Sequence, residues 1–172
     1  MPSSAKPTKP PARRKPAVPA DAARQFLELY YPIHYQAGIR VEDAMRGGEL
    51  SRHQVAILWL IHAEGEHGRR MNRKAIERSL GNWFEISGAA ITKAVRSMSH
   101  APNKLVDLEE DPRSGREKVI VLTRDGEAYL RAMIGRGEAF IERIIERMDG
   151  AEIVSGIHFF ERIRAIVAEL DS

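Results

Sequence analysis

Cysteine is absent from this chain of 172 residues. Its absence excludes disulfide bonds, thiolate metal sites, cysteine nucleophiles and thiol-based redox sensing. Long hydrophobic runs are missing as well, since no stretch approaches the roughly 18 apolar residues of a membrane span. The N-terminus is basic and rich in proline, but no apolar run follows it, so it does not have the pattern of a secretory signal. We therefore expect a cytoplasmic protein.

Catalytic motifs are also lacking. The sequence contains no glycine-rich phosphate loop, no nucleophile elbow and no HExxH motif. His62 and His67 lie near Glu64 and Glu66, but their spacing is not typical of a zinc site. The sequence therefore predicts neither an enzyme nor a bound cofactor or metal.

Basic residues are concentrated in two blocks, although the formal net charge is only +3. Residues 1–20 carry five basic residues and no acidic one, and residues 69–96 carry seven basic against two acidic residues. By contrast, residues 21–68 carry four basic against seven acidic residues. Positive blocks within a mildly acidic chain indicate a binding surface for a polyanion. The proline-rich block 1–20 is predicted to be a disordered arm, which either only aids solubility or contacts phosphates.

The spacing of apolar residues predicts a mainly helical chain. A first helix is expected over residues 21–46, with Asp21 as its N-cap, a kink or break at Pro32 and an end at Gly47. Ser51 and Gln54 form a capping box. The elements expected from there on are a helix over about 51–63, a loop over 64–70, a helix over about 72–80 ended by Gly81 and Asn82, a helix over about 88–99 capped by Ser87, strands over 105–109 and 118–122 joined by a charged turn, and long helices over about 123–148 and 151–170.

Three helices followed by a two-stranded hairpin are the order of a winged helix-turn-helix. The predicted fold class is thus mainly α with a small β-hairpin, flanked by long helices. These flanking helices carry apolar stripes that so small a core cannot bury, which favours a homodimer. The predicted organisation is a disordered basic arm over 1–20, an N-terminal dimerisation helix over 21–48, a DNA-binding lobe over 49–123 and C-terminal dimerisation helices over 124–172.

Three motifs follow one another between about residues 50 and 130. They read Leu50-Ser51-x-x-Gln54-x-x-x-Leu58, Ile86-Ser87-x-x-x-Ile91-Thr92-Lys93-x-Val95 and Leu122-Thr123-x-x-Gly126. Together they resemble the first helix, the recognition helix and the wing exit of the MarR family of transcriptional regulators. The resemblance implies a homodimer that binds a pseudo-palindromic DNA operator, and we expect a repressor.

The predicted wing departs from the pattern of that family. The family usually has Asp-x-Arg at the wing tip, where the Asp fixes the Arg. Here Arg116 keeps the arginine, whereas Ser114 replaces the aspartate. The support for Arg116 is therefore either weaker or supplied by Asp111. The links over 81–85 and 99–103 also differ from those of the family.

Candidate DNA contacts fall into three groups. The polar face of the helix over about 88–99 suits the major groove, where Lys93 or Arg96 is expected on guanine. Arginines of the wing suit the minor groove, and the start of the helix over about 72–80 suits phosphates. The candidates on the recognition helix are Ser87, Ala89, Ala90, Thr92, Lys93 and Arg96, and those on the wing are Arg113, Arg116 and Lys118. The candidates for contacts with the DNA backbone are Arg69, Arg70, Arg73 and Lys74.

The resemblance also implies a small aromatic or anionic effector, held in a cleft between the dimerisation helices and the DNA-binding lobe. Tyr30, His34, Trp59 and His62 are the candidates for lining it. An ordinary role in the core is the competing interpretation, because aromatic residues at helical spacing usually pack internally.

Two other functions remain open on the sequence alone. One is a winged-helix module for protein–protein contact, which would not need two basic blocks. The other is an architectural DNA-binding protein without operator preference, which the basic arm favours and the polar recognition helix disfavours. Selection of bound sites from random DNA separates the architectural protein from a regulator.

Overall fold

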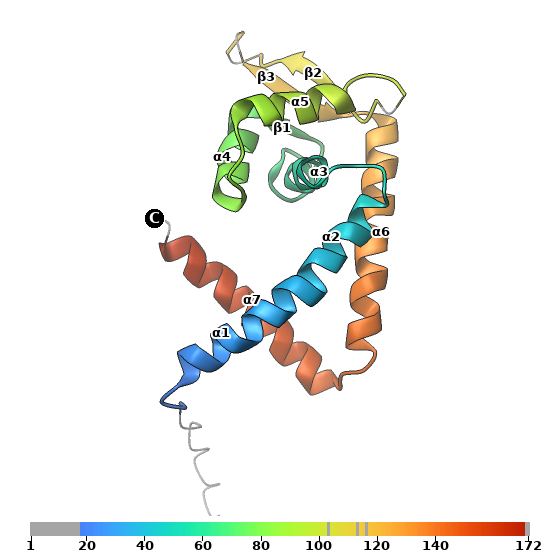
Figure 1. The fold of residues 1–172 in the computed structure, drawn as a ribbon. Coiled ribbons are helices and arrows are strands. Elements are labelled where there is room, and N and C mark those ends of the chain that lie inside the picture. The colour runs from blue at the N-terminus through green and yellow to red at the C-terminus, as the bar shows by residue number, and fades with distance from the viewer. Residues whose placement is uncertain (1–17, 103, 113, 116, 171–172) are drawn as a thin grey trace, which may run out of the picture.

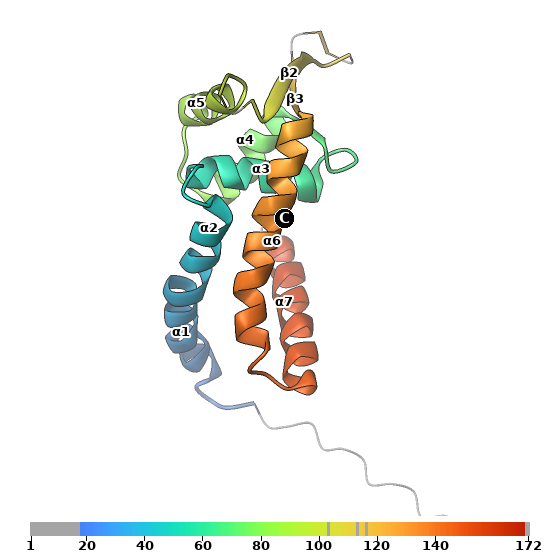
Figure 2. The same ribbon diagram turned by 90° about the vertical axis from the view of Figure 1, so that its right-hand side faces the viewer.

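The computed structural model describes residues 18–102, 104–112, 114–115 and 117–170. Its elements are α1 (Ala22–Ile33), the π-helical segment η1 (His34–Gly38), α2 (Ile39–Arg46), α3 (Arg52–Glu64), β1 (Arg70–Asn72), α4 (Arg73–Trp83), α5 (Gly88–Met98), β2 (Val106–Glu110), β3 (Lys118–Leu122), α6 (Arg124–Ile145) and α7 (Gly150–Leu170). Helices α3, α4 and α5 and the sheet form a lobe at one end of α6 (Figure 1). Helix α1 continues the line of α2 away from the lobe, and α7 turns back from the far end of α6 and crosses α1 in the view of Figure 1 (Figures 1 and 2).

The expected N-terminal helix is divided into three consecutive helical segments. Asp21 occupies the N-cap position, but its carboxylate accepts a hydrogen bond from the side chain of Gln25 instead of capping the backbone. Pro32 lies in the last turn of α1, where it provides no N–H, and the π-helical η1 begins two residues later. Gly47 ends α2 in the left-handed conformation, with φ of 60°, so the expected end of this helix is confirmed.

The capping predictions for the lobe are confirmed. Ser51 and Gln54 form a reciprocal capping box, in which the Gln54 N–H donates to Ser51 Oγ and the Ser51 N–H to Gln54 Oε1. Ser87 caps α5 by accepting from the Ala90 N–H at 3.2 Å. Thr123 caps α6 by accepting from the Gly126 N–H at 2.9 Å. These side chains satisfy N–H groups that the first turn of a helix leaves without a partner.

The expected end of a helix at Gly81 and Asn82 is wrong. Helix α4 continues to Trp83, and the Phe84 N–H still donates to the Leu80 carbonyl at 2.9 Å. Ile76 and Leu80 are fully buried and hold the helix against the lobe, whereas nothing lies close to Gly81. A glycine costs a helix only about 1 kcal/mol, so this packing outweighs its low propensity.

The sheet has three strands, not the expected two. Its order is β1-β3-β2, with both pairs antiparallel. Residues 64–70 were expected to form a loop, yet Arg70 begins β1 and Met71 pairs with Ile120 of β3. The short strand covers the edge of β3 that the hairpin alone would leave open. Its three residues are too few for an alternating pattern to show in the sequence.

The core lies in the lobe and extends to the first half of α6. Helix α3 is buried on most sides, and Ile57, Leu58, Leu60 and Ile61 have no exposed surface. Helices α1 and α7 contain no buried residue, although Phe26 of α1 and Phe159 of α7 stack at 5.6 Å between ring centroids. Among the described helices, none combines the length and the apolarity needed to cross a bilayer.

Candidate nucleic-acid interface

Helix α5 exposes one polar face. Ile91, Ala94, Val95 and Met98 are buried against the lobe, so the opposite side of the helix is left to solvent. The exposed residues include four of the predicted recognition-helix residues, which are Ala89, Thr92, Lys93 and Arg96. Ala90 is half-buried, and Ser87 is exposed at the N-cap. The helix is therefore held by its apolar side and free to enter a groove with its polar side.

Lys93 and Arg96 have no acidic partner among the described residues. Among the described residues, no hydrogen bond involves the Arg96 guanidinium. The Arg96 carbonyl accepts from the Ser99 N–H at 3.2 Å and from Ser99 Oγ at 3.0 Å, and lies 2.7 Å from His100 Nδ1. These contacts satisfy the end of α5. Both cationic side chains thus remain available to a ligand.

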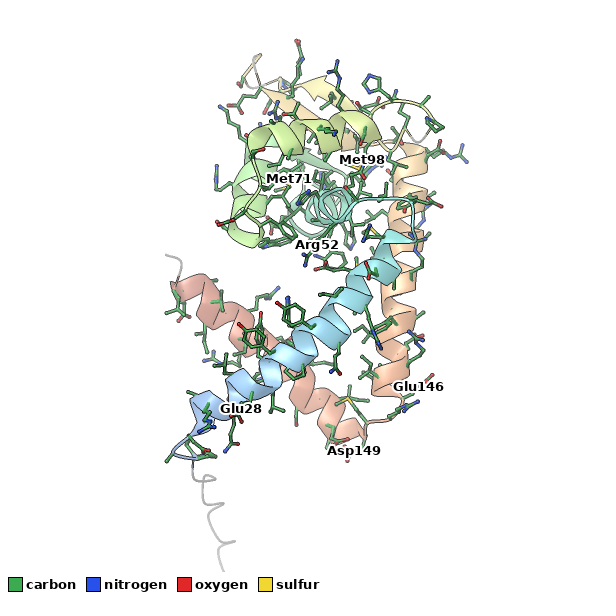
Figure 3. All side chains as sticks on the ribbon, viewed as in Figure 1. Glu28, Arg52, Met71, Met98, Glu146 and Asp149 are labelled. Carbon is green, nitrogen blue, oxygen red and sulfur yellow. The ribbon has the colours of Figure 1, made fainter. Side chains whose placement is uncertain are left out.

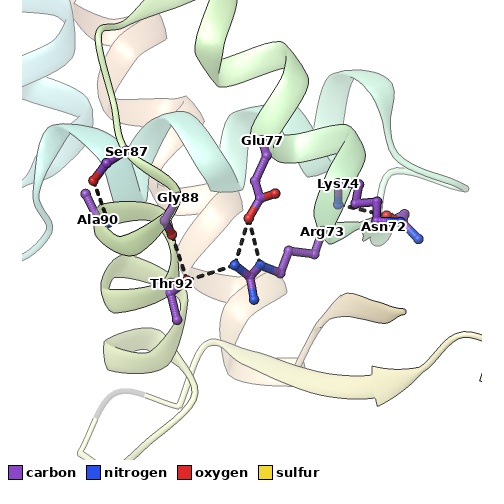
Figure 4. A network of polar contacts seen from close by, with 8 residues as sticks. All are labelled: Asn72, Arg73, Lys74, Glu77, Ser87, Gly88, Ala90 and Thr92. Carbon is purple, nitrogen blue, oxygen red and sulfur yellow. Dashed lines mark hydrogen bonds and ion pairs between the residues drawn. The ribbon is translucent and has the colours of Figure 1, made fainter. Parts of the chain in front are cut away.

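Arg73 instead joins α4 to α5 in a network of polar contacts (Figure 4). Its Nε and Nη2 lie 2.9 and 2.8 Å from Glu77 Oε1, and Nη2 also donates to Thr92 Oγ1 at 2.8 Å. The Thr92 hydroxyl donates in turn to the Gly88 carbonyl at 2.7 Å. The guanidinium is thereby fixed beside the polar face of α5.

Most other cations near α4 and the sheet are also paired with acids. Their partners come from outside the basic block, which is why the residue count of residues 69–96 overstates its charge. The pairs are Arg69 with Glu127, Arg70 with Glu66 at 3.7 Å and Glu109 at 3.9 Å, Lys74 with Glu117, and Lys118 with Glu110 at 3.0 Å. The cationic side chains of these pairs are between 35% and 70% exposed, so phosphates can compete for them.

The base of the wing is tied to the start of α4. Asn72 Nδ2 donates to Glu117 Oε2 at 2.8 Å and to Asp111 Oδ2 at 3.3 Å, and Lys74 Nζ contacts Glu117 Oε1. The hydrogen bonds from Lys74 and Asn72 hold the pKa of Glu117 below its usual value. Asp111 is thus part of this network, while Arg113 and Arg116 lie outside the described residues.

A polar groove of about 440 Å³ lies between the start of α4 and the wing. It is lined by Asn72, Arg73, Lys74, Glu77, Ser114, Glu117 and Lys118. Three of these side chains are basic and two are acidic, so the groove keeps a single excess positive charge. Arg73 and Glu77 of its lining lie against Thr92 and Gly88 of α5 (Figure 4), so the groove adjoins the polar face of that helix.

Two apolar cavities lie between the lobe and the long helices, and Val41, Met45 and Trp59 line both. The first, of about 280 Å³, is also lined by Arg52, Trp83 and Phe84. The second, of about 560 Å³, extends along α6 from Ile134 to Ile145. In the first, pairing with Glu42 holds the pKa of Arg52 above its usual value, and the guanidinium lies 5.2 Å from the centre of the Phe84 ring.

The four candidate effector residues form two separate pairs. Tyr30 stacks on His34 with 5.6 Å between ring centroids, and Trp59 lies 5.8 Å from His62. Trp59 lines both apolar cavities, whereas the linings of these two cavities do not include the other three residues. The structure therefore does not bring the four into one of these cavities.

Sequence reasoning missed the acidic and amide partners at this interface. Glu77 could have been found, because its spacing of four from Arg73 is that of a helical ion pair. Glu117 and Asn72 could not, because their contact joins residues 45 apart in the chain. The sequence predicts only a capping role for Gln54, but in the structure its Nε2 also donates to Ser97 Oγ of α5 at 2.7 Å.

No family model and no curated protein sequence matches this chain. Several solved structures resemble it. A MarR family protein from Bacillus stearothermophilus has a TM-score of 0.69 at 17% identity, with 91% of this chain and 100% of that one covered. MepR, a transcription regulator of the Staphylococcus aureus multidrug efflux pump MepA, has a TM-score of 0.64 at 14% identity, with 83% and 98% covered. Transcriptional regulator Tm0710 from Thermotoga maritima has a TM-score of 0.60 at 19% identity, with 85% and 96% covered.

These likenesses extend over most of each chain compared. They include the long helices on either side of the lobe as well as the lobe itself, since more than four fifths of this chain is covered in each case. The chain therefore has the winged-helix fold of the MarR-family structures.

Proposed function

We propose that this chain is a transcriptional regulator that binds duplex DNA as a homodimer and represses from a pseudo-palindromic operator. The observation that carries the proposal is the exposed polar face of α5, where Lys93 and Arg96 have no acidic partner among the described residues. The fold supports it, because similar structures are those of transcription regulators. An α-helix fits the major groove of B-DNA, where the donor and acceptor pattern of each base pair is distinct.

Each part of the interface has its own role in this proposal. Lys93 and Arg96 donate to guanine O6 and N7. The polar groove between α4 and the wing, which Lys74 lines, takes the sugar–phosphate backbone, and Arg69 and Arg70 supply further phosphate contacts. Contacts of this kind fix register but carry no sequence information. Arg113 and Arg116 extend the wing into the minor groove, where a guanidinium responds to groove width.

The homodimer rests on the apolar surfaces of α1 and α7. Phe26 is 55% exposed, Phe160 69% and Leu170 79%, and neither helix has a buried residue. Large exposed apolar surfaces usually mark an interaction site. A second copy would cover them and place two α5 helices about one DNA turn, roughly 34 Å, apart.

DNA binding is tested with a random pool of duplex DNA, from which bound sequences are selected over several rounds. We expect a pseudo-palindrome whose half-sites are about one turn apart, and an affinity that falls steeply with salt. A flat salt dependence would contradict the phosphate contacts. Salt-dependent binding without any enriched sequence would instead indicate an architectural DNA-binding protein.

The dimer is tested by sedimentation of the wild-type chain and of Phe160→Glu. The expected result is a dimer for the wild type and a monomer for the variant, because a carboxylate in an apolar interface is costly to desolvate. Leu108→Glu is the matched control, since Leu108 of β2 is 45% exposed but lies on the wing. A wild-type monomer at micromolar concentration would overturn the dimer.

The effector of the proposed regulator is a small aromatic compound. The cavity of about 280 Å³ at Trp59, Trp83 and Phe84 suits a small aromatic compound. Because Arg52 is already paired with Glu42, an apolar aromatic fits this cavity better than an anion. Quenching of tryptophan fluorescence by a panel of small aromatic compounds tests it. Trp83→Leu should weaken binding, and Trp59, which lines the same cavity, remains to report it.

A further inference from the structure

Glu77 stands out at the proposed interface because it is an acid beside a surface meant for a polyanion. Its carboxylate is about one-third exposed. It lies against the first residue of α5, since a Cβ on Gly88 would be 3.8 Å from Glu77 Oε1. A carboxylate in this position repels phosphate and so weakens DNA binding. Its presence therefore calls for a second role.

The geometry of Arg73 supplies that role. One edge of the guanidinium, Nε with Nη2, faces Glu77 Oε1, and Nη2 also donates to Thr92 Oγ1. These contacts use the three hydrogens of Nε and Nη2, and only Nη1 is left without a described partner. Arg73 is therefore held toward α5 and its charge is offset locally (Figure 4).

We propose that Glu77 is a specificity-determining residue, which withholds Arg73 from DNA phosphates and so suppresses sequence-independent binding. This inference rests on the proposed function. Non-specific affinity for DNA comes almost entirely from cations that neutralise phosphates. Discrimination between partners improves when attraction for the wrong ones is reduced. Lys93 and Arg96, which face the bases, have no such acidic partner among the described residues.

The test measures how the affinity for DNA depends on salt. The DNA is a single duplex of 30 base pairs whose sequence is random. Dissociation constants are measured between about 50 and 200 mM salt for the wild type, Glu77→Gln, Arg73→Gln and the double variant. Gln keeps the size of Glu77 but not its charge, so the packing beside Gly88 is kept while the ion pair with Arg73 is lost. Thermal unfolding of each variant checks that the fold is retained. Glu146→Gln is the matched control, because it removes the same charge at the far end of α6 (Figure 3).

In Glu77→Gln, Arg73 gains one phosphate contact per protomer. We expect the slope of log K against log salt to steepen by about 0.9 per protomer, or about 1.8 for the proposed dimer, so that the loss of affinity over this fourfold range of salt is about 12-fold larger than in the wild type. Arg73→Gln alone should leave the slope at the wild-type value, because Glu77 already holds that cation. The double variant should return to the wild-type slope, and Glu146→Gln should not change it.

Two results would overturn the role of Glu77. One is a wild-type slope in Glu77→Gln. The other is a steeper slope that persists in the double variant, which would assign the effect to net charge and not to Arg73. Either leaves the proposed function intact if the wild type still binds DNA. A wild-type chain that does not bind duplex DNA overturns the proposed function and this role together.

Discussion

The guanidinium of Arg136 occupies the space where a side chain at residue 47 would lie. A Cβ on Gly47 would be 3.0 Å from Arg136 Cζ. Arg136 of α6 donates from Nε to the Ala44 carbonyl at 3.1 Å and from Nη2 to the Met45 carbonyl at 2.9 Å. Both carbonyls belong to the last turn of α2, where the helix itself supplies few donors, and the Ala44 carbonyl also accepts from the Gly47 N–H at 3.3 Å. The cation therefore caps α2 and joins it to α6.

Gly47→Ala should destabilise the fold more than Gly48→Ala. Both glycines have positive φ, of 60° and 76°, so each substitution incurs the cost of about 1–2 kcal/mol for a left-handed residue. Only Gly47→Ala also displaces Arg136, since nothing lies within 4 Å of a Cβ at Gly48. Urea unfolding of both variants measures the difference. If both variants lose the same free energy of unfolding, the contact with Arg136 does not contribute to the cost of Gly47→Ala.

Gly126→Ala should be severely destabilising, whereas Gly135→Ala should be neutral or stabilising. Both glycines lie in α6, but a Cβ at Gly126 would be 1.9 Å from the Leu105 carbonyl oxygen, and a Cβ at Gly135 would have open space. The first clash is with backbone and cannot be relieved by a rotamer. At Gly135 the helix should gain up to about 1 kcal/mol. Thermal unfolding compares the two, and a well-folded Gly126→Ala would contradict the close approach of α6 to Leu105.

Arg96→Ala should change which DNA sequences the chain prefers. The expected loss is about 1–3 kcal/mol on a selected site, confined to one or two base positions per half-site, because a guanidinium on guanine discriminates against other bases. Arg131→Ala is the control, since it removes the same charge from an exposed position of α6. Binding to a panel of single-base variants of the selected site measures the change. A uniform loss across the panel would place Arg96 on phosphate.

The contribution of Glu117 to stability should disappear in acid. Lys74 and Asn72 hold its pKa below the usual value in the folded chain, so its stabilisation is complete above the unfolded pKa of about 4.3 and is lost as pH falls through the lower folded pKa. The Tm of the wild type should exceed that of Glu117→Gln by a constant amount above about pH 5. The gap should close below about pH 4.

Much of the fold was predictable because its signals are local. Ser51, Ser87 and Thr123 each precede an apolar helical pattern, and a cap together with that pattern is sufficient to place the start of a helix. The strands of the wing alternate in the sequence and form where expected. The end of α4 was not predictable, because burial of Ile76 and Leu80 outweighs the glycine at 81.

The candidate interface was predictable only in part. The polar face of α5 follows from helical spacing, and the structure exposes it. The pairing of the cations with acids does not follow from the sequence, because Lys74 and Arg69 contact acids that lie 43 and 58 positions further along the chain. The third strand was missed for the same reason, since β1 exists only through its pairing with β3.

The π-helical segment η1 has a consequence for the orientation of the two ends of the long N-terminal helix. A π-helical turn holds one residue more than the α-helix around it, and one residue of an α-helix corresponds to about 100° of rotation. Deletion of a single residue from His34–Gly38 would therefore leave an ordinary α-helical turn and keep Phe26 and Tyr30 of α1 at nearly the same angle to α2, whereas deletion of one residue from α2, which has no wide turn, would rotate them by about 100°. In the proposed dimer, this one wide turn would let the chain lose a residue without a change in the angle at which two copies meet or in the spacing of their DNA half-sites.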